Sequence, residues 1–95
     1  MKNPREMMAD EIRRMVRKFR AHPWDINCGR CDEFADAVAA RVPGAVAYDL
    51  GTEDTVLFWA HTCIKFDGLF YDAEEPYGVK HWRQLPTCVR ARRTK

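Results

Sequence analysis

The segment HTCIKFDGLFYDA, residues 61–73, decides the fold because it is typical of two strands joined by a tight turn. Asp67-Gly68 is a strong signal for a two-residue hairpin, so we expect Phe66 to pair with Leu69. Side chains alternate along a strand, and this register therefore fixes which of them share a face. The face that carries polar and reactive side chains is expected to hold His61, Cys63, Asp72 and Glu74.

Working outward, residues 45–50 and 56–66 have the composition of strands, and residues 69–73 return as the partner strand. Residues 5–20 and 28–42 have apolar side chains at helical spacing, residues 79–85 predict a short helical segment, and residues 88–95 form a basic tail. The sequence thus predicts one α+β domain over residues 1–95. An N-terminal helix and a cysteine-bearing helix would pack on a three-stranded antiparallel sheet spanning residues 45–73.

Cys31 stands in the first turn of the second expected helix, on its apolar stripe. Asn27 is a candidate N-cap for that helix. A helix N-terminus carries unpaired N–H groups and partial positive charge, which favour a thiolate. Asn27 is also a candidate donor to an oxyanion formed near Cys31.

A histidine and a carboxylate downstream of such a cysteine are the groups that activate a thiol nucleophile. In the expected register Asp72 is the diagonal neighbour of His61, close enough for their side chains to meet. We therefore expect Cys31 to act as nucleophile, His61 as general base and acid, and Asp72 to orient the imidazole.

Two motifs resemble those of a known family. Gly29-Arg30-Cys31-Asp32-Glu33-Phe34-Ala35 resembles the Gly-x-Cys-x-x-(Phe/Tyr)-Ala helix start of transglutaminase-like cysteine enzymes, a branch of the papain-like superfamily. His61 followed by the segment 67–74 resembles the hairpin that supplies the other two catalytic residues in that fold.

The resemblance implies a cysteine-bearing helix packed on an antiparallel sheet, and chemistry through a thioacyl intermediate without a cofactor or metal. It implies peptide or amide hydrolysis, or acyl transfer to an amine, with Cys31, His61 and Asp72 as the catalytic triad. Glu74 is the alternative third member, because the family's carboxylate often lies six residues past the hairpin glycine. The compact core also resembles an accessory protein of a phage or mobile element.

The composition of the chain limits the classes of partner that we expect it to bind. A net charge of +2 over 95 residues does not favour nucleic acid, and no apolar run is long enough for a membrane span. The N-terminus lacks the pattern of a secretory signal, so we expect a cytoplasmic protein with four reduced cysteines. Its partner would be a protein, a peptide or a small amide, and the sequence indicates no particular oligomeric state.

Three other interpretations remain open. Cys28 and Cys31 have the Cys-x-x-Cys spacing of redox dithiols, although no βαβ unit precedes them. The same two residues with His61 and Cys63 could form a Cys3His zinc site. Alternatively, the chain is a catalytically inactive papain-like binding protein that contacts a partner through the basic face of its first helix.

Overall fold

The structure is a computed structural model that describes residues 2–52 and 61–93. Its helices are α1 (Pro4–Phe19), α2 (Pro23–Gly29), α3 (Cys31–Arg41) and α4 (Pro86–Arg93). Its strands are β1 (Val46–Asp49), β2 (Thr62–Phe66), β3 (Leu69–Asp72) and β4 (Glu75–Val79). Short 3₁₀ helices η1 and η2 cover Leu50–Thr52 and Trp82–Gln84.

The four strands form one antiparallel sheet in the order β1-β2-β3-β4. Phe66 pairs with Leu69, as the hairpin signal predicts. Both turn residues have positive φ, 51° at Asp67 and 79° at Gly68, which is the backbone of a two-residue hairpin turn. The predicted α+β class, with helices packed on an antiparallel sheet, is confirmed.

The sheet has four strands, so the prediction of three was wrong. The fourth strand, β4, lies where the composition of residues 74–78 favours a loop. It pairs with β3 through an irregular register between Phe70 and Asp72. Pro76 is tolerated because β4 is an edge strand, and Gly78 supplies a φ of 80° that other residues rarely adopt.

The cysteine-bearing helix begins at Cys31 rather than at residue 28. Residues 23–29 form a separate helix, α2, and Arg30 at φ −130° and ψ 22° separates the two. Asn27 therefore lies inside α2 and is not the N-cap of α3. That position belongs to Arg30, whose side chain makes no capping hydrogen bond.

The C-terminal segment also differs from expectation. The helical segment expected at residues 79–85 is reduced to the single turn η2, which His81 and Gln84 close through reciprocal capping hydrogen bonds. Residues 86–93 form the helix α4 where a basic tail was expected. Cys88 of this helix is buried in an apolar cluster with Cys63 of the sheet and Leu85. The part of the predicted second strand at residues 56–60 lies outside the described residues.

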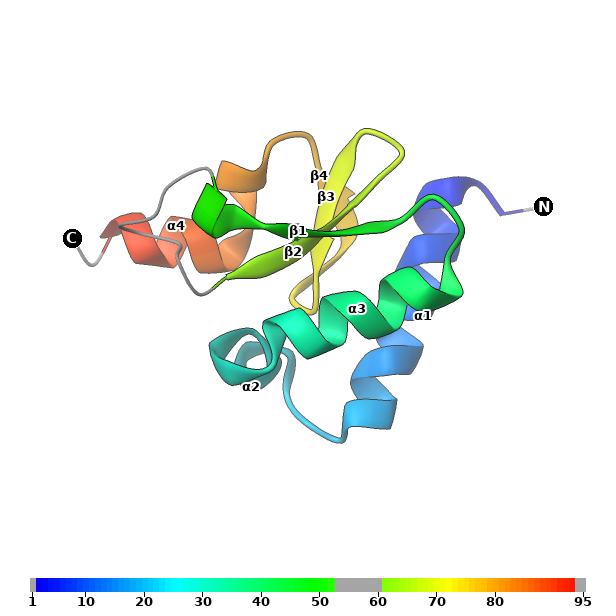
Figure 1. Ribbon diagram of the computed structural model, residues 1–95, viewed down its shortest axis with the longest axis horizontal. Coiled ribbons are helices and arrows are strands. Elements are labelled where there is room, and N and C mark those ends of the chain that lie inside the picture. Colours follow the sequence, from blue (N-terminus) through cyan, green and yellow to red (C-terminus); the bar gives the residue numbers. More distant parts are fainter. Residues whose placement is uncertain (1, 53–60, 94–95) are drawn as a thin grey trace.

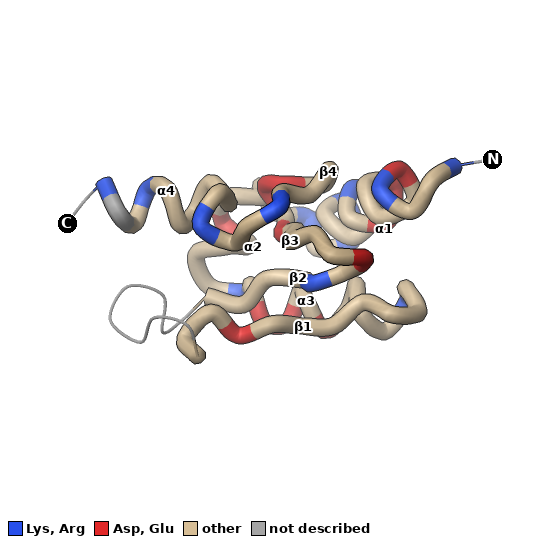
Figure 2. The backbone as a smooth tube through the Cα atoms, turned by 90° about the horizontal axis from the view of Figure 1, so that it is seen from above, with Lys and Arg blue, Asp and Glu red and all other residues tan. Residues whose placement is uncertain are grey.

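Two apolar clusters lie on opposite faces of the sheet. The larger is formed where α1 and α3 pack against the face that carries Ile64 and Tyr71. The smaller lies where η2 and α4 cover Cys63 and Phe70. Lys and Arg residues, blue in Figure 2, occupy several positions of α1 and α4. These two helices reach opposite ends of the long axis (Figures 1 and 2). Across residues 2–52 and 61–93, no helix has both the length and the apolar character that crossing a membrane requires.

Candidate active site

Three elements bring Cys31, His61 and Asp72 into one buried place. Cys31 is the first residue of α3, His61 directly precedes β2, and Asp72 ends β3. Their side chains are 6%, 5% and 2% exposed. The Thr62 N–H donates to the Cys31 Sγ over 3.4 Å, and the His61 Nε2 lies 3.4 Å from the Asp72 Oδ2. The structure thus joins a helix start to the ends of two neighbouring strands.

The Asp72 carboxylate is fixed by the turn that follows it. Its Oδ1 accepts hydrogen bonds from the backbone N–H groups of Glu74 and Glu75, each over 2.9 Å. An aspartate that binds the backbone two and three residues ahead is a common way to close a turn. This arrangement holds Oδ1 and leaves Oδ2 directed at His61.

The charge of His61 is strongly stabilised. Burial alone would lower the pKa of this imidazole, but the Asp72 carboxylate and the Cys31 sulfur raise it from 6.5 to about 9. At neutral pH the ring is therefore protonated and carries a positive charge. A buried imidazolium beside a carboxylate and a thiol is the charge arrangement that thiol activation requires.

The pKa of Cys31 responds in the opposite direction. Burial raises it, but the neighbouring His61 and the Thr62 N–H together bring the pKa of this thiol below its usual 9.0. Cys63 provides the contrast: burial raises the pKa of that thiol far above the usual range, with Asp72 adding to the effect. Of these two buried cysteines, only Cys31 has the environment of a nucleophile.

The contact between His61 and Asp72 is an ion pair rather than a formed hydrogen bond. Within the described part of the chain, neither ring nitrogen of His61 nor the Asp72 Oδ2 has a partner with hydrogen-bond geometry. The 3.4 Å separation sustains Coulomb attraction but exceeds a normal N–H···O bond of about 3 Å. Such contacts are often long before substrate binds and shorten in the complex.

Glu74 does not join this group. Its carboxylate binds Arg90 at 2.6 and 3.0 Å and also accepts hydrogen bonds from Asn27 and Thr87. Burial raises the pKa of Glu74, but these donors, led by Arg90, lower it overall. The structure thus brings Asp72 to His61 and directs Glu74 to α4.

Asn27 also serves this second network. Its Nδ2 donates to the Glu74 Oε1 over 2.9 Å and to the Thr87 Oγ1 over 3.2 Å. Both hydrogens of the amide are therefore occupied, and the arrangement offers neither to an oxyanion at Cys31. Sequence reasoning missed the role of Thr62, because a backbone N–H leaves no trace in the residue pattern. It also missed Arg90, which sits in a segment that resembles a solvated tail.

The four residues of the possible zinc site are not gathered. Cys28 is exposed on α2, while Cys63 is buried with Leu50, Trp82 and Cys88 in the smaller apolar cluster. No three His, Cys, Asp or Glu side chains in the described ranges are arranged to hold a metal ion.

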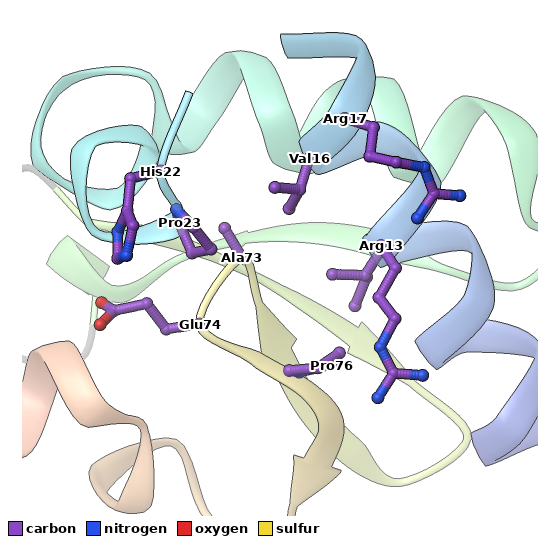
Figure 3. Close-up of a pocket in the computed structure, with 9 residues that line it drawn as sticks. Arg13, Val16, Arg17, His22, Pro23, Ala73, Glu74 and Pro76 are labelled. Carbon is purple, nitrogen blue, oxygen red and sulfur yellow. The ribbon is translucent and has the colours of Figure 1, made fainter. Parts of the chain in front are cut away.

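Figure 3 shows an open groove of about 510 Å³. It runs between the second half of α1, the start of α2 and the turn between β3 and β4. We call it the α1 groove; its lining residues are Ile12, Arg13, Val16, Arg17, His22, Pro23, Ala73, Glu74 and Pro76. Cys31, His61 and Asp72 are not among its lining residues.

Comparisons of the chain with protein-family models, with curated proteins and with solved structures find no match. The residues of the candidate site and their geometry are therefore the basis for assigning a function.

Proposed function

We propose that the chain is a thiol-dependent enzyme that acts on an amide or ester bond. Cys31 is the nucleophile, His61 the general acid and base, and Asp72 the group that orients and charges the imidazole. One observation carries the proposal: a buried His61 whose pKa is raised to about 9 lies 3.4 Å from Asp72 and lowers the pKa of Cys31. Electrostatics of this kind favour a thiolate–imidazolium pair at neutral pH.

The chemistry follows from these roles. The Cys31 thiolate attacks the carbonyl carbon, and the carbonyl oxygen becomes an oxyanion. The first turn of α3 places the positive end of a helix dipole beside that charge. His61 then gives its proton to the leaving amine or alkoxide, and a thioester forms on Cys31. Water or an amine releases the acyl group while His61 takes up its proton.

The resemblance to transglutaminase-like and papain-like enzymes supports this reaction class and suggests a protein, peptide or small amide as substrate. None of the four cysteines forms a disulfide, which is consistent with a reducing compartment such as the cytoplasm. A role as an accessory protein of a phage or mobile element belongs to the same proposal. None of these steps requires a cofactor.

A catalytically inactive binding protein is the second candidate. It is favoured by the burial of the triad, since Cys31 is 6% and His61 5% exposed. The basic side chains of α1 would then contact a partner. This candidate needs the fold but not a reactive thiol, so the two proposals differ in one measurable property.

That property is the rate at which Cys31 is alkylated by iodoacetamide between pH 5 and 10. For the enzyme, we expect one thiol to react with an apparent pKa well below 8, and this fast phase to disappear in Cys31→Ser. Cys28→Ser is the matched control, because it removes an exposed thiol three residues away. Slow alkylation of Cys31, with a pKa near 8.5 or above, would remove the enzyme proposal and leave the binding protein.

A further inference from the structure

The α1 groove has an apolar floor and a charged rim. Ile12 and Ala73 are buried beneath it, and Val16 is partly buried beside them. Figure 3 shows Val16, Ala73 and Pro23 between two charged sides of the groove. The two arginines lie on one side, and His22 with Glu74 lies on the other. A volume of about 510 Å³ falls within the range of small-molecule sites.

The charge on the arginine side is only partly compensated. Arg13 donates a hydrogen bond to the Tyr77 hydroxyl, and its guanidinium stands 4.6 Å from the centre of that ring. In the part of the chain that the structure describes, Arg17 has no ion pair with an acidic side chain. The two arginines are four residues apart on one helix face, where like charges repel. An anion bound between them would relieve that repulsion.

The negative charge on the acidic side of the groove is neutralised by a residue outside the groove. Glu74 forms its ion pair with Arg90 of α4, which does not line the groove. His22 presents a donor, because its Nδ1 accepts the Trp24 N–H over 3.1 Å and the neutral ring therefore carries its proton on Nε2. Positive charge thus prevails along the rim.

We propose that the α1 groove binds a small organic acid with an apolar body. Its carboxylate would lie against Arg13 and Arg17, and its hydrocarbon part would cover Val16 and Ala73. Aliphatic burial supplies most of the affinity, and the arginines select an anion over a neutral or cationic group. This site is separate from the proposed reaction at Cys31.

The test compares three molecules with the same six-carbon body: hexanoate, hexan-1-ol and hexylammonium. Each is titrated at neutral pH into ¹⁵N-labelled full-length Cys31→Ser protein, so that thiol chemistry plays no part. We expect hexanoate to shift the amide resonances of Val16 and Ala73 and to bind about threefold or more tightly than hexan-1-ol, as an exposed ion pair allows. Hexylammonium should bind more weakly than the alcohol.

Arg17→Gln and Lys18→Gln form a matched pair, because both remove one positive charge from an exposed position of α1 and only Arg17 lines the groove. Arg17→Gln should weaken hexanoate binding about threefold and leave hexan-1-ol unchanged, whereas Lys18→Gln should alter neither. The proposal is overturned by equal binding of the acid and the ammonium ion, by equal effects of the two variants, or by shifts confined to other surfaces. Because Cys31 is absent from the test protein, none of these outcomes bears on the enzyme proposal.

Discussion

At the residue scale, Asp72 controls the charge of His61. Replacing Asp72 with Asn keeps the size of the side chain and removes its negative charge. The Asp72 carboxylate is the largest of the influences that raise the pKa of His61 to about 9. We therefore expect the pKa of His61 in Asp72→Asn to fall from about 9 toward 6.5, measured from the imidazole resonances by NMR. An imidazole that still titrates near 9 would show that Asp72 does not orient and charge it.

Asp32→Asn is matched to Asp72→Asn and should shift the pKa of Cys31 in the opposite direction. Its carboxylate is exposed near the start of α3 and raises the pKa of the Cys31 thiol slightly, against the larger lowering by His61. In alkylation profiles, Asp32→Asn should therefore move the apparent pKa of Cys31 downward. Asp72→Asn should move it upward, because the imidazolium beside the thiol is lost. Shifts in the same direction would contradict this account of the charges.

Gly78 is the glycine that the sheet can least replace. Its φ is 80°, and a Cβ added there would lie 2.7 Å from the Cζ of Tyr71, whose side chain is fully buried. Because the ring has no free space to move into, we expect Gly78→Ala to lower the free energy of unfolding by about 2–4 kcal/mol. Urea denaturation measures this change.

Gly29→Ala is the control for that measurement. A Cβ at Gly29 meets nothing within 4 Å, and the residue lies at the end of α2. Alanine there should be neutral or stabilise the fold by up to about 1 kcal/mol. A similar loss of stability in both variants would mean that the close approach to Tyr71 is not the cause.

At the element scale, the Glu74–Arg90 ion pair ties α4 to the turn between β3 and β4. Glu74 is 15% exposed and Arg90 is 42% exposed, so water screens the pair only in part. Two contacts to one guanidinium give it better geometry than a typical surface pair. A double-mutant cycle with Glu74→Gln and Arg90→Gln should give a coupling free energy of about 1 kcal/mol. A coupling near zero would mean that α4 is held by apolar packing alone.

The elements that sequence could predict are those with a strong local signal. The turn at Asp67-Gly68 fixed the register of β2 and β3 because only a few residue pairs suit two successive positive φ values. Helix α1 follows the prediction for residues 5–20 within a residue at each end, because its apolar spacing is regular and Pro4 suits its first turn. The same hairpin register predicts that His61 and Asp72 share one face of the sheet.

The elements that sequence could not predict depend on tertiary contacts. Residues 75–79 include Pro76 and Gly78 and are a strand because β3 offers them an edge to pair with. Helix α4 forms in a basic segment because Cys88 is buried with Leu85 and Arg90 meets Glu74. Asn27 was expected to cap α3, but it lies inside α2, which ends before Arg30, and its amide donates to Glu74. Glu74 lies 16 residues from Arg90 and 47 residues from Asn27, so a local sequence pattern does not reveal these two contacts.

At the scale of the whole molecule, the candidate site lies where the start of α3 meets the sheet. Cys31 comes from a helix that packs on one face with the larger apolar cluster. The neighbouring Cys63 belongs to the smaller cluster on the other face. His61 is buried and its pKa is raised to about 9, so its protonation contributes to the stability of the fold.

The stability of the fold should therefore depend on pH in a defined direction. His61 holds its proton more tightly in the fold, with a pKa of about 9 against 6.5 in the unfolded chain. Its contribution is complete below pH 6.5 and is lost as the pH rises toward 9.

Cys31 opposes this trend because its pKa is lowered. The measurement is therefore made in the Cys31→Ser background, where Asp72 still raises the pKa of His61. Urea unfolding should show stability falling by roughly 1–2 kcal/mol between pH 6 and 8.5, whereas Cys31→Ser with His61→Gln should stay nearly level over the same range. Equal slopes in the two proteins would mean that the imidazole is not held as a cation beside Asp72, and the proposed mechanism would lose its source of positive charge.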